Sequence, residues 1–117
     1  MKFLLDANFL MIPGKFKVDV FSELERFGRP ELYTLDLVVK ELEKMHANLA
    51  LIFIKKKKIK ILKTKSKNVK NTDKEIIRIA KEKGVVVCTQ DKKLILKLKK
   101  ENVAIVSLRQ RKYLERV

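Results

Sequence analysis

The sequence is short of several residue types, and each shortage excludes a class of protein. Its one cysteine, Cys88, allows no internal disulfide and no cysteine-based zinc site, so we expect a reducing, cytoplasmic location. Three glycines and two prolines among 117 residues argue against a disordered chain. The longest apolar run, Leu49 to Ile54, has six residues and is too short to span a membrane. We therefore expect a single folded domain over residues 1–117.

Histidine and acidic residues are also scarce. His46, the only histidine, is predicted on the surface in mid-helix, so histidine-based general acid and base chemistry is not expected. The chain has 29 Lys and Arg against 14 Asp and Glu, a formal net charge of +15. Such an excess predicts a polyanionic partner, with nucleic acid ahead of an anionic membrane surface.

Hydrophobic periodicity predicts alternating strands and helices in the first half of the chain. A buried strand is expected at residues 2–5, and a helix at 18–27 that Gly28 and Pro30 terminate. A short strand around residues 32–35 follows. Asp36 is then a good N-cap for a long helix that continues to about Ile54.

The second half repeats the alternation. The pattern predicts an edge strand at residues 59–62, and a capping box at Asn71–Glu75 that begins a helix ending at Gly84. A strand at 85–89, a helix from about 90 to 101 and a strand at 103–107 complete the chain. This spacing is typical of an α/β domain with a parallel central sheet that helices cover on both faces.

Three acidic residues lie where strands and helices meet. Asp6 directly follows the strand at 2–5, Asp91 follows the strand at 85–89, and Asp73 opens the helix between. Ligands of open α/β sheets bind in the crevice at these junctions. Carboxylates that converge there repel one another unless a cation lies between them, and hard oxygen ligands select Mg²⁺ or Mn²⁺. The pattern predicts a metal-dependent nuclease.

A fourth acid, Glu41, lies within the apolar stripe of the long helix. It follows Val38 by three residues and precedes Met45 by four, and a glutamate is rarely buried unless it is paired. It is therefore either at the edge of the stripe or directed into a site. Glu43 remains an alternative on spacing alone.

Each acid also has a structural explanation. Asp6 can cap a helix or form an Asx-turn, and Asp73 and Glu75 both suit a first helical turn. Asp91 can lie in a first turn that Thr89 caps. The functional interpretation rests on several junctions supplying an acid independently.

At these residues the chain resembles a PIN-domain nuclease, and the match extends over nearly its whole length. The similar motifs are Leu4–Leu10 ("LLDTNFL"), Val38–Lys44 ("VVxELEK"), Thr72–Ile76 ("ADDxI") and Thr89–Leu94 ("TNDxxL"). The second motif selects Glu41 over Glu43. The segment from Val106 to Leu114 resembles the strand and basic tail of the subgroup that processes pre-ribosomal RNA. Lys74 and Gln90 depart from the pattern.

The resemblance implies a PIN-like three-layer sandwich and a divalent-metal-dependent endoribonuclease that uses Mg²⁺ or Mn²⁺. Asp6 and Asp91 would be the inner metal ligands, and Glu41 and Asp73 would complete the catalytic site directly or through water. Asn8 and Thr89 would orient the carboxylates. Either a toxin held by an antitoxin or an enzyme of ribosomal RNA processing fits the resemblance, as does a homodimer.

Basic residues are expected to hold the RNA backbone. The stretch from Lys55 to Lys70 holds nine lysines and no acid. The predicted RNA contacts are Lys55, Lys56, Lys57, Lys58, Lys60, Lys63, Lys65, Arg109, Arg111 and Lys112. A non-catalytic PIN-like RNA-binding module is the alternative, and a membrane-surface or partner-binding protein that uses Leu49–Lys58 ranks below it, since it leaves the acids unexplained.

Overall fold

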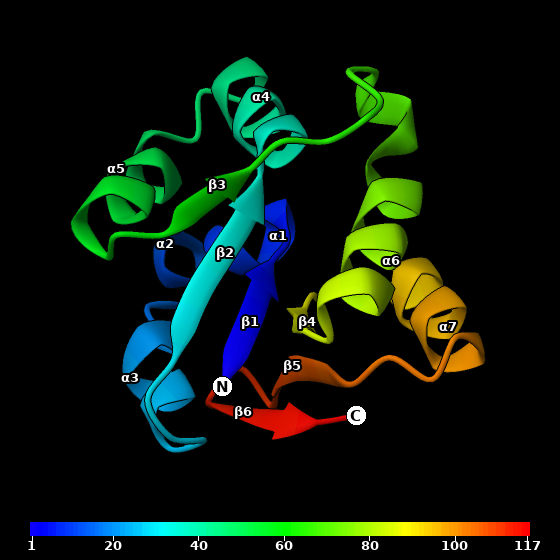
Figure 1. The fold of residues 1–117 in the computed structure, drawn as a ribbon. Coiled ribbons are helices and arrows are strands. Elements are labelled where there is room, and N and C mark those ends of the chain that lie inside the picture. Colours follow the sequence, from blue (N-terminus) through cyan, green and yellow to red (C-terminus); the bar gives the residue numbers. More distant parts are fainter.

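A six-stranded sheet organises the computed structural model, which describes all residues 1–117 (Figure 1). The strand order is β3-β2-β1-β4-β5-β6, and the sheet is parallel except for the antiparallel edge strand β6. The strands are β1 (Lys2–Leu5), β2 (Glu31–Leu35), β3 (Lys60–Leu62), β4 (Val86–Cys88), β5 (Ile105–Arg109) and β6 (Tyr113–Arg116). The predicted α/β class with a parallel central sheet is confirmed.

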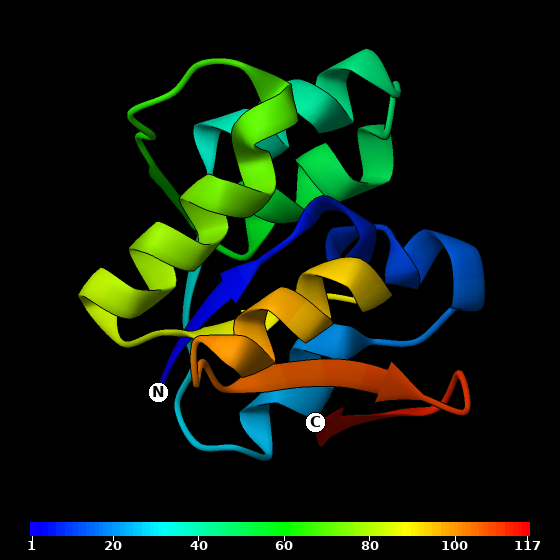
Figure 2. The same cartoon turned by 90° about the vertical axis from the view of Figure 1, so that its right-hand side faces the viewer.

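Seven α-helices and one 3₁₀ helix connect the strands. They are α1 (Ala7–Leu10), α2 (Ile12–Phe16), α3 (Val20–Glu25), α4 (Asp36–Lys44), α5 (Asn48–Lys56), η1 (Val69–Asn71), α6 (Thr72–Lys83) and α7 (Lys92–Lys100). Figures 1 and 2 show α6 and α7 together on one side of the sheet, with α3 and α5 on the other. None of these helices has the length and apolar character that a bilayer crossing requires.

The chain leaves the two central strands in opposite directions. From β1 it proceeds to β2 and β3, whereas from β4 it proceeds to β5, so the strand order reverses between β1 and β4. Right-handed crossovers then place the connecting helices of the two halves on opposite faces. The point of reversal leaves a crevice at the carboxyl ends of β1 and β4, where ligands of such sheets bind.

The central strands are continuous apolar runs because both of their faces are covered. Phe3, Leu4 and Leu5 of β1 are buried, and so are Val87 and Cys88 of β4. Cys88 is therefore a core residue, as predicted. Because these strands are held in the core, the residues that directly follow them, Asp6 after β1 and Thr89 after β4, have fixed positions at the edge of the sheet.

The predicted long helix from Asp36 to Ile54 is wrong, because the chain turns between α4 and α5. His46 has a positive φ of 54°, and the Ala47 N–H donates to the Leu42 carbonyl instead of continuing the helix. The turn folds α5 back so that Ala50 and Ile54 join the core together with α4. His46 is exposed in this turn rather than in mid-helix.

Two further local predictions are corrected. Asn71 makes no capping hydrogen bond, so the predicted capping box does not form, although α6 does end at Gly84. The edge strand β6 was not expected, because the turn before it lacks the asparagine or glycine that usually signals a hairpin. Gln110 and Arg111 adopt positive φ angles there instead.

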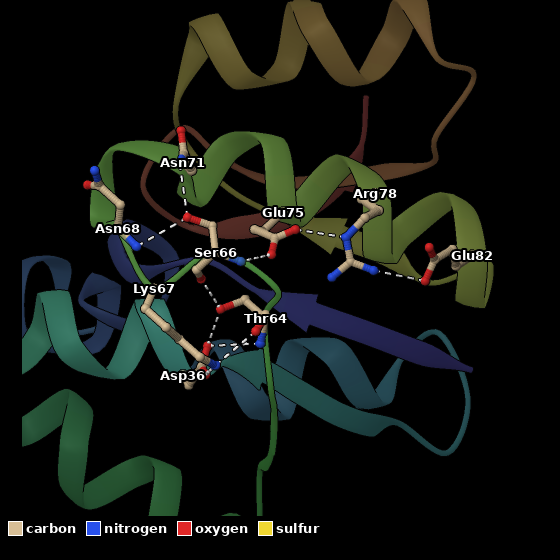
Figure 3. Close-up of polar contacts among 9 residues, drawn as sticks. All are labelled: Asp36, Thr64, Ser66, Lys67, Asn68, Asn71, Glu75, Arg78 and Glu82. Carbon is tan, nitrogen blue, oxygen red and sulfur yellow. Dashed lines mark hydrogen bonds and ion pairs between the residues drawn. The ribbon is translucent and has the colours of Figure 1, made fainter.

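The loop between β3 and α6 (residues 63–71, the β3–α6 loop) is held by polar contacts to both α4 and α6, as Figure 3 shows. At its start, Asp36 of α4 accepts hydrogen bonds from the Thr64 N–H at 3.2 Å and the Thr64 hydroxyl at 2.8 Å. The Lys67 ammonium donates to the other oxygen of Asp36 at 2.7 Å. These bonds lower the pKa of Asp36 against the effect of its partial burial.

The same part of the loop is tied to α6 through Glu75. One carboxylate oxygen of Glu75 accepts from the Ser66 N–H at 2.8 Å, and the other accepts from Arg78 Nε at 2.8 Å (Figure 3). Arg78 also contacts Glu82 at 3.0 Å. Glu75 is buried, so its occurrence in α6 is explained by this loop contact.

Glu75→Gln is expected to lower the free energy of unfolding by about 2 kcal/mol at pH 7, since one amide group cannot accept hydrogen bonds on both sides. The hydrogen bond from Arg78 lowers the pKa of Glu75 in the folded protein. Its contribution is therefore complete above the usual value of 4.5 and is lost as the pH falls through the lowered pKa. Urea unfolding at pH 7 and well below 4.5 measures this difference.

Glu82→Gln is the matched control, because Glu82 contacts the same guanidinium from an exposed position. Its cost should be no more than about 0.5 kcal/mol. Equal effects of the two substitutions at pH 7 would contradict the role assigned to Glu75.

Candidate active site

The four predicted acids line one cavity at the carboxyl ends of β1 and β4. The cavity has a volume of about 210 Å³, and its lining residues are Asp6, Ala7, Asn8, Glu41, Val69, Lys70, Thr72, Asp73 and Asp91. Larger cavities lie elsewhere, but the cavity beside Gly84 has one carboxylate and the groove between α2 and α5 has none. Chemistry rather than volume therefore distinguishes this cavity.

Asp6 is the most constrained of the four acids. It is the N-cap of α1, where one carboxylate oxygen accepts from the Ala7 N–H at 2.8 Å and the other from the Thr89 hydroxyl at 2.9 Å. Only 8% of its surface is exposed. Burial raises the pKa of Asp6 to about 6, and repulsion from Glu41 and Asp73 adds to the effect of burial. The capping role and the site position apply to the same side chain.

Thr89 connects the two central strands. Its hydroxyl donates to the Asp6 carboxylate and accepts from the Asp91 N–H at 3.1 Å. One buried hydroxyl therefore contacts both Asp6 and Asp91. Asn8 lies beside it and accepts from the Gln90 N–H at 3.2 Å. Gln90 in turn accepts from the Ser107 hydroxyl at 2.8 Å, which anchors the loop to β5.

Asp91 is itself the N-cap of α7. One of its oxygens accepts from the N–H groups of Lys93 at 2.9 Å and Leu94 at 3.3 Å. The expectation that Thr89 caps this helix is therefore wrong, and Thr89 supports Asp91 from behind instead. The second oxygen of Asp91 makes no hydrogen bond within the protein, which leaves it available to a ligand.

Glu41 and Asp73 approach the cavity from α4 and α6. Both are partly buried, and burial is the largest cause of their raised pKa values. Repulsion from Asp73 also raises the pKa of Glu41, and repulsion from Asp91 raises that of Asp73. Lys97 of α7 partly offsets this, with its ammonium 3.8 Å from an Asp73 oxygen. Glu43, the alternative to Glu41, is exposed and does not line the cavity.

The donor set fits a hard divalent cation, since all four acids offer carboxylate oxygens. Burial is the main cause of the raised pKa values of Asp6, Glu41 and Asp73, and repulsion between carboxylates adds to it. No three acidic, histidine or cysteine side chains are grouped closely enough to hold a metal ion by themselves. Mg²⁺ usually keeps several water ligands in protein sites, so one or two carboxylates are enough for it.

The basic residues predicted to bind RNA divide into two groups, one at each end of the strands. The first group lies at the end where the acids are. It consists of Lys63 and Lys65, which follow β3, and of Arg109, Arg111 and Lys112, at or after the carboxyl end of β5. Arg111 is placed over the Phe16 ring at 5.2 Å from its centroid, and Arg109 lies 3.9 Å from Glu115.

The second group lies at the other end of the sheet. Lys55 to Lys58 precede β3 and so stand at the amino ends of the parallel strands, away from the acidic cavity. Lys57 is placed over the Phe21 ring at 5.5 Å, and Lys60 over Tyr33 at 5.8 Å. The structure therefore does not bring these lysines to the four acids.

Two lysines beside the acids were not singled out from the sequence: Lys70, which lines the cavity, and Lys97, which pairs with Asp73. Lys70 lies within the lysine-rich stretch, and its place three residues before Asp73 was a usable signal. Lys97 had no such signal, because only the packing of α7 against α6 brings it to Asp73.

Comparisons with known proteins show which family and fold this chain is similar to. A family model described as a PIN-like domain matches residues 3–111. Ribonuclease VapC4 of Methanocaldococcus jannaschii is 32% identical over 124 residues, which cover 97% of this chain and 95% of that protein.

Two solved structures are similar to this chain in fold. The PIN domain endonuclease Utp24 matches with a TM-score of 0.84 and 26% identity, covering 99% of this chain and 92% of that one. A PilT N-terminus domain protein of Sulfolobus solfataricus shares the fold, with a TM-score of 0.60 and 18% identity over 92% of this chain and 87% of its own.

Asp6→Asn is expected to stabilise the metal-free protein at pH 7.5 by up to about 3 kcal/mol, since it removes a buried charge. The folded pKa of about 6 lies above the usual 3.8, so the folded protein binds the extra proton between these values. Wild-type stability therefore falls as the pH rises from about 4 to about 6. Thermal or urea unfolding in EDTA at pH 4 and 7.5 measures the difference, which should be small at pH 4.

Asp19→Asn is the control for this experiment. Asp19 is an exposed N-cap of α3 whose side chain accepts from the Ser22 N–H, and asparagine caps a helix equally well. It should leave the stability nearly unchanged at both pH values. A destabilised Asp6→Asn protein at pH 7.5 in EDTA would contradict the buried-charge argument.

Proposed function

The chain belongs to the PIN-like domain family, and on that premise we propose that it is a divalent-metal-dependent endoribonuclease that hydrolyses phosphodiester bonds of RNA. The observation that carries the proposal is the convergence of Asp6, Glu41, Asp73 and Asp91 on one cavity at the reversal point of the sheet. The names of two similar proteins, a ribonuclease and an endonuclease, support the reaction class.

Each acid has a separate role in this proposal. Asp6 and Asp91 would hold Mg²⁺ or Mn²⁺ from the ends of the two central strands, and Glu41 and Asp73 would complete the site directly or through water. The chemistry that such an ion supplies when bound is activation of water for attack on phosphorus and stabilisation of charge on the phosphate oxygens. Thr89 keeps Asp6 and the Asp91 backbone in register through its two hydrogen bonds.

The substrate class follows from charge. A net charge of +15 attracts a polyanion, and the basic residues after β3 and β5 lie at the same end of the sheet as the acidic cavity. Toxin activity under the control of an antitoxin and processing of ribosomal RNA both use this chemistry. Sequencing the RNA ends that the protein produces in cells would distinguish them.

Cleavage of a long, partly structured RNA tests the reaction. The wild type should cut it with Mn²⁺ or Mg²⁺ and not with EDTA. Asp6→Asn and Asp91→Asn should each lower the rate by more than about 100-fold. Each substitution removes the charge of a metal ligand, and the metal would stabilise the transition state by several kcal/mol. Gel analysis of the products over time measures these rates.

Asp19→Asn serves again as the control and should cut as the wild type does. If all variants and the wild type bind RNA equally and none cuts it with any metal, the proposal fails. The protein would then be the non-catalytic RNA-binding module, for which binding alone is sufficient.

Thr89→Val is expected to raise the Mn²⁺ concentration needed for half-maximal cleavage by about 10- to 100-fold, because a group that orients a metal ligand is lost while the volume is kept. A titration of the cleavage rate with Mn²⁺ measures this.

Thr34→Val is the matched control, since Thr34 is equally buried and its hydroxyl donates to the Leu5 carbonyl, not to an acid. It should cost stability without shifting the Mn²⁺ requirement. Identical shifts for both variants would show a general loss of rigidity and not a specific role for Thr89.

A further inference from the structure

Lys70 is the one basic residue that lines the acidic cavity directly. It lies in η1, immediately before α6, and shares the cavity wall with the four acids. Its ammonium forms no ion pair within 4.0 Å, whereas Lys97 is paired with Asp73 and Lys67 with Asp36. A cation beside four carboxylates that is paired with none of them is free to bind an anion that enters the cavity.

The backbone that carries Lys70 is fixed by side chains on both sides. Asn68 accepts from the Lys70 N–H at 3.0 Å, and the Ser66 hydroxyl accepts from the Asn68 N–H at 3.2 Å and the Asn71 amide at 2.9 Å. Figure 3 shows the contacts of Ser66 with Asn68 and Asn71, next to the contacts of the loop with Asp36 and Glu75. The loop therefore presents Lys70 from a fixed position and not from a free tail.

Charge explains why the cavity needs such a residue. One divalent cation among four ionised carboxylates leaves the site with a net negative charge, which repels a phosphodiester. Lys97 is already committed to Asp73, so Lys70 is the available positive group at the cavity wall. The lysines from Lys55 to Lys58 cannot take this part, since they precede β3 at the far end of the sheet.

We propose that Lys70 binds a phosphate oxygen of the RNA strand at the acidic cavity and so positions the strand against the four carboxylates. This inference rests on the proposed nuclease function and deepens it, since it names a substrate-contacting residue. Lysine serves as a point charge for phosphate, and such a contact is independent of base sequence.

Binding and cleavage by Lys70→Gln test the inference, with Lys70→Arg as the conservative variant. Lys74→Gln is the matched control, because Lys74 is an exposed lysine of α6 that lines a separate cavity with Glu75 and Arg78. Single-turnover cleavage with Mn²⁺ at varied protein concentrations separates RNA affinity from the maximal rate. Fluorescence anisotropy of a labelled single-stranded RNA in Ca²⁺, with its integrity checked on a gel, measures affinity without relying on turnover.

Lys70→Gln should weaken RNA binding about fivefold to tenfold and reduce the salt dependence of log Kd by about 0.7, the loss of one phosphate contact on a single strand. Lys70→Arg should stay within about threefold of the wild type, and Lys74→Gln within about twofold. The melting temperatures of all three variants should match that of the wild type.

Equal RNA affinity and equal salt dependence for Lys70→Gln and Lys74→Gln would overturn the inference. A wild type that binds RNA but never cuts it would overturn the nuclease proposal instead, and the anisotropy measurements would still decide the role of Lys70. Weakened binding that Lys70→Arg does not restore would assign the residue a structural role and also overturn the inference.

Discussion

The burial of the Asp6 carboxylate at the end of β1 is the constraint on which the site depends. A charge with 8% of its surface exposed is costly, and only the Thr89 hydroxyl and the Ala7 N–H partly offset that cost. Repulsion from Glu41 and Asp73 adds to the cost of burying the charge, and a cation bound between the carboxylates would relieve it. The ionised Asp6 carboxylate therefore lowers the stability of the fold and places a negative charge at the cavity.

The sheet makes this arrangement possible with very short elements. Because β1 and β4 are adjacent and parallel, with Leu5 opposite Cys88, the residues that follow them emerge side by side. Thr89 can then reach Asp6 with one hydroxyl although the two are far apart in sequence. The acids that do not follow a strand come from helices whose positions are set by loops, and the β3–α6 loop holds α4 and α6 together through Asp36 and Glu75.

Sequence patterns were informative where one interaction decides the local structure. The apolar run of β1 predicted the strand, because a strand that is covered on both faces needs a continuous apolar sequence. The acid that follows it, Asp6, was expected at the crevice and lines the cavity there. The turn at His46 could not be predicted, since periodicity continues through it and only packing of α5 against α4 favours the break. Thr89 was expected to cap α7, but Asp91 caps it, and Thr89 contacts Asp6 instead. Either residue type can cap a helix, and the choice depended on a neighbour from another strand.

The basic residues act on a polyanion in two ways, which depend on how far they lie from the acidic cavity. Screening at physiological ionic strength has a length of about 8 Å, so lysines before β3 act weakly on a phosphate at the opposite end of the strands. They raise the general affinity of the molecule for a polyanion, as its net charge of +15 does. Groups after the carboxyl ends of β3 and β5 lie on the side where the acids are, and only Lys70 reaches the cavity wall itself. A basic molecule can therefore present an acidic site to an anionic substrate, because the two kinds of charge act at different distances.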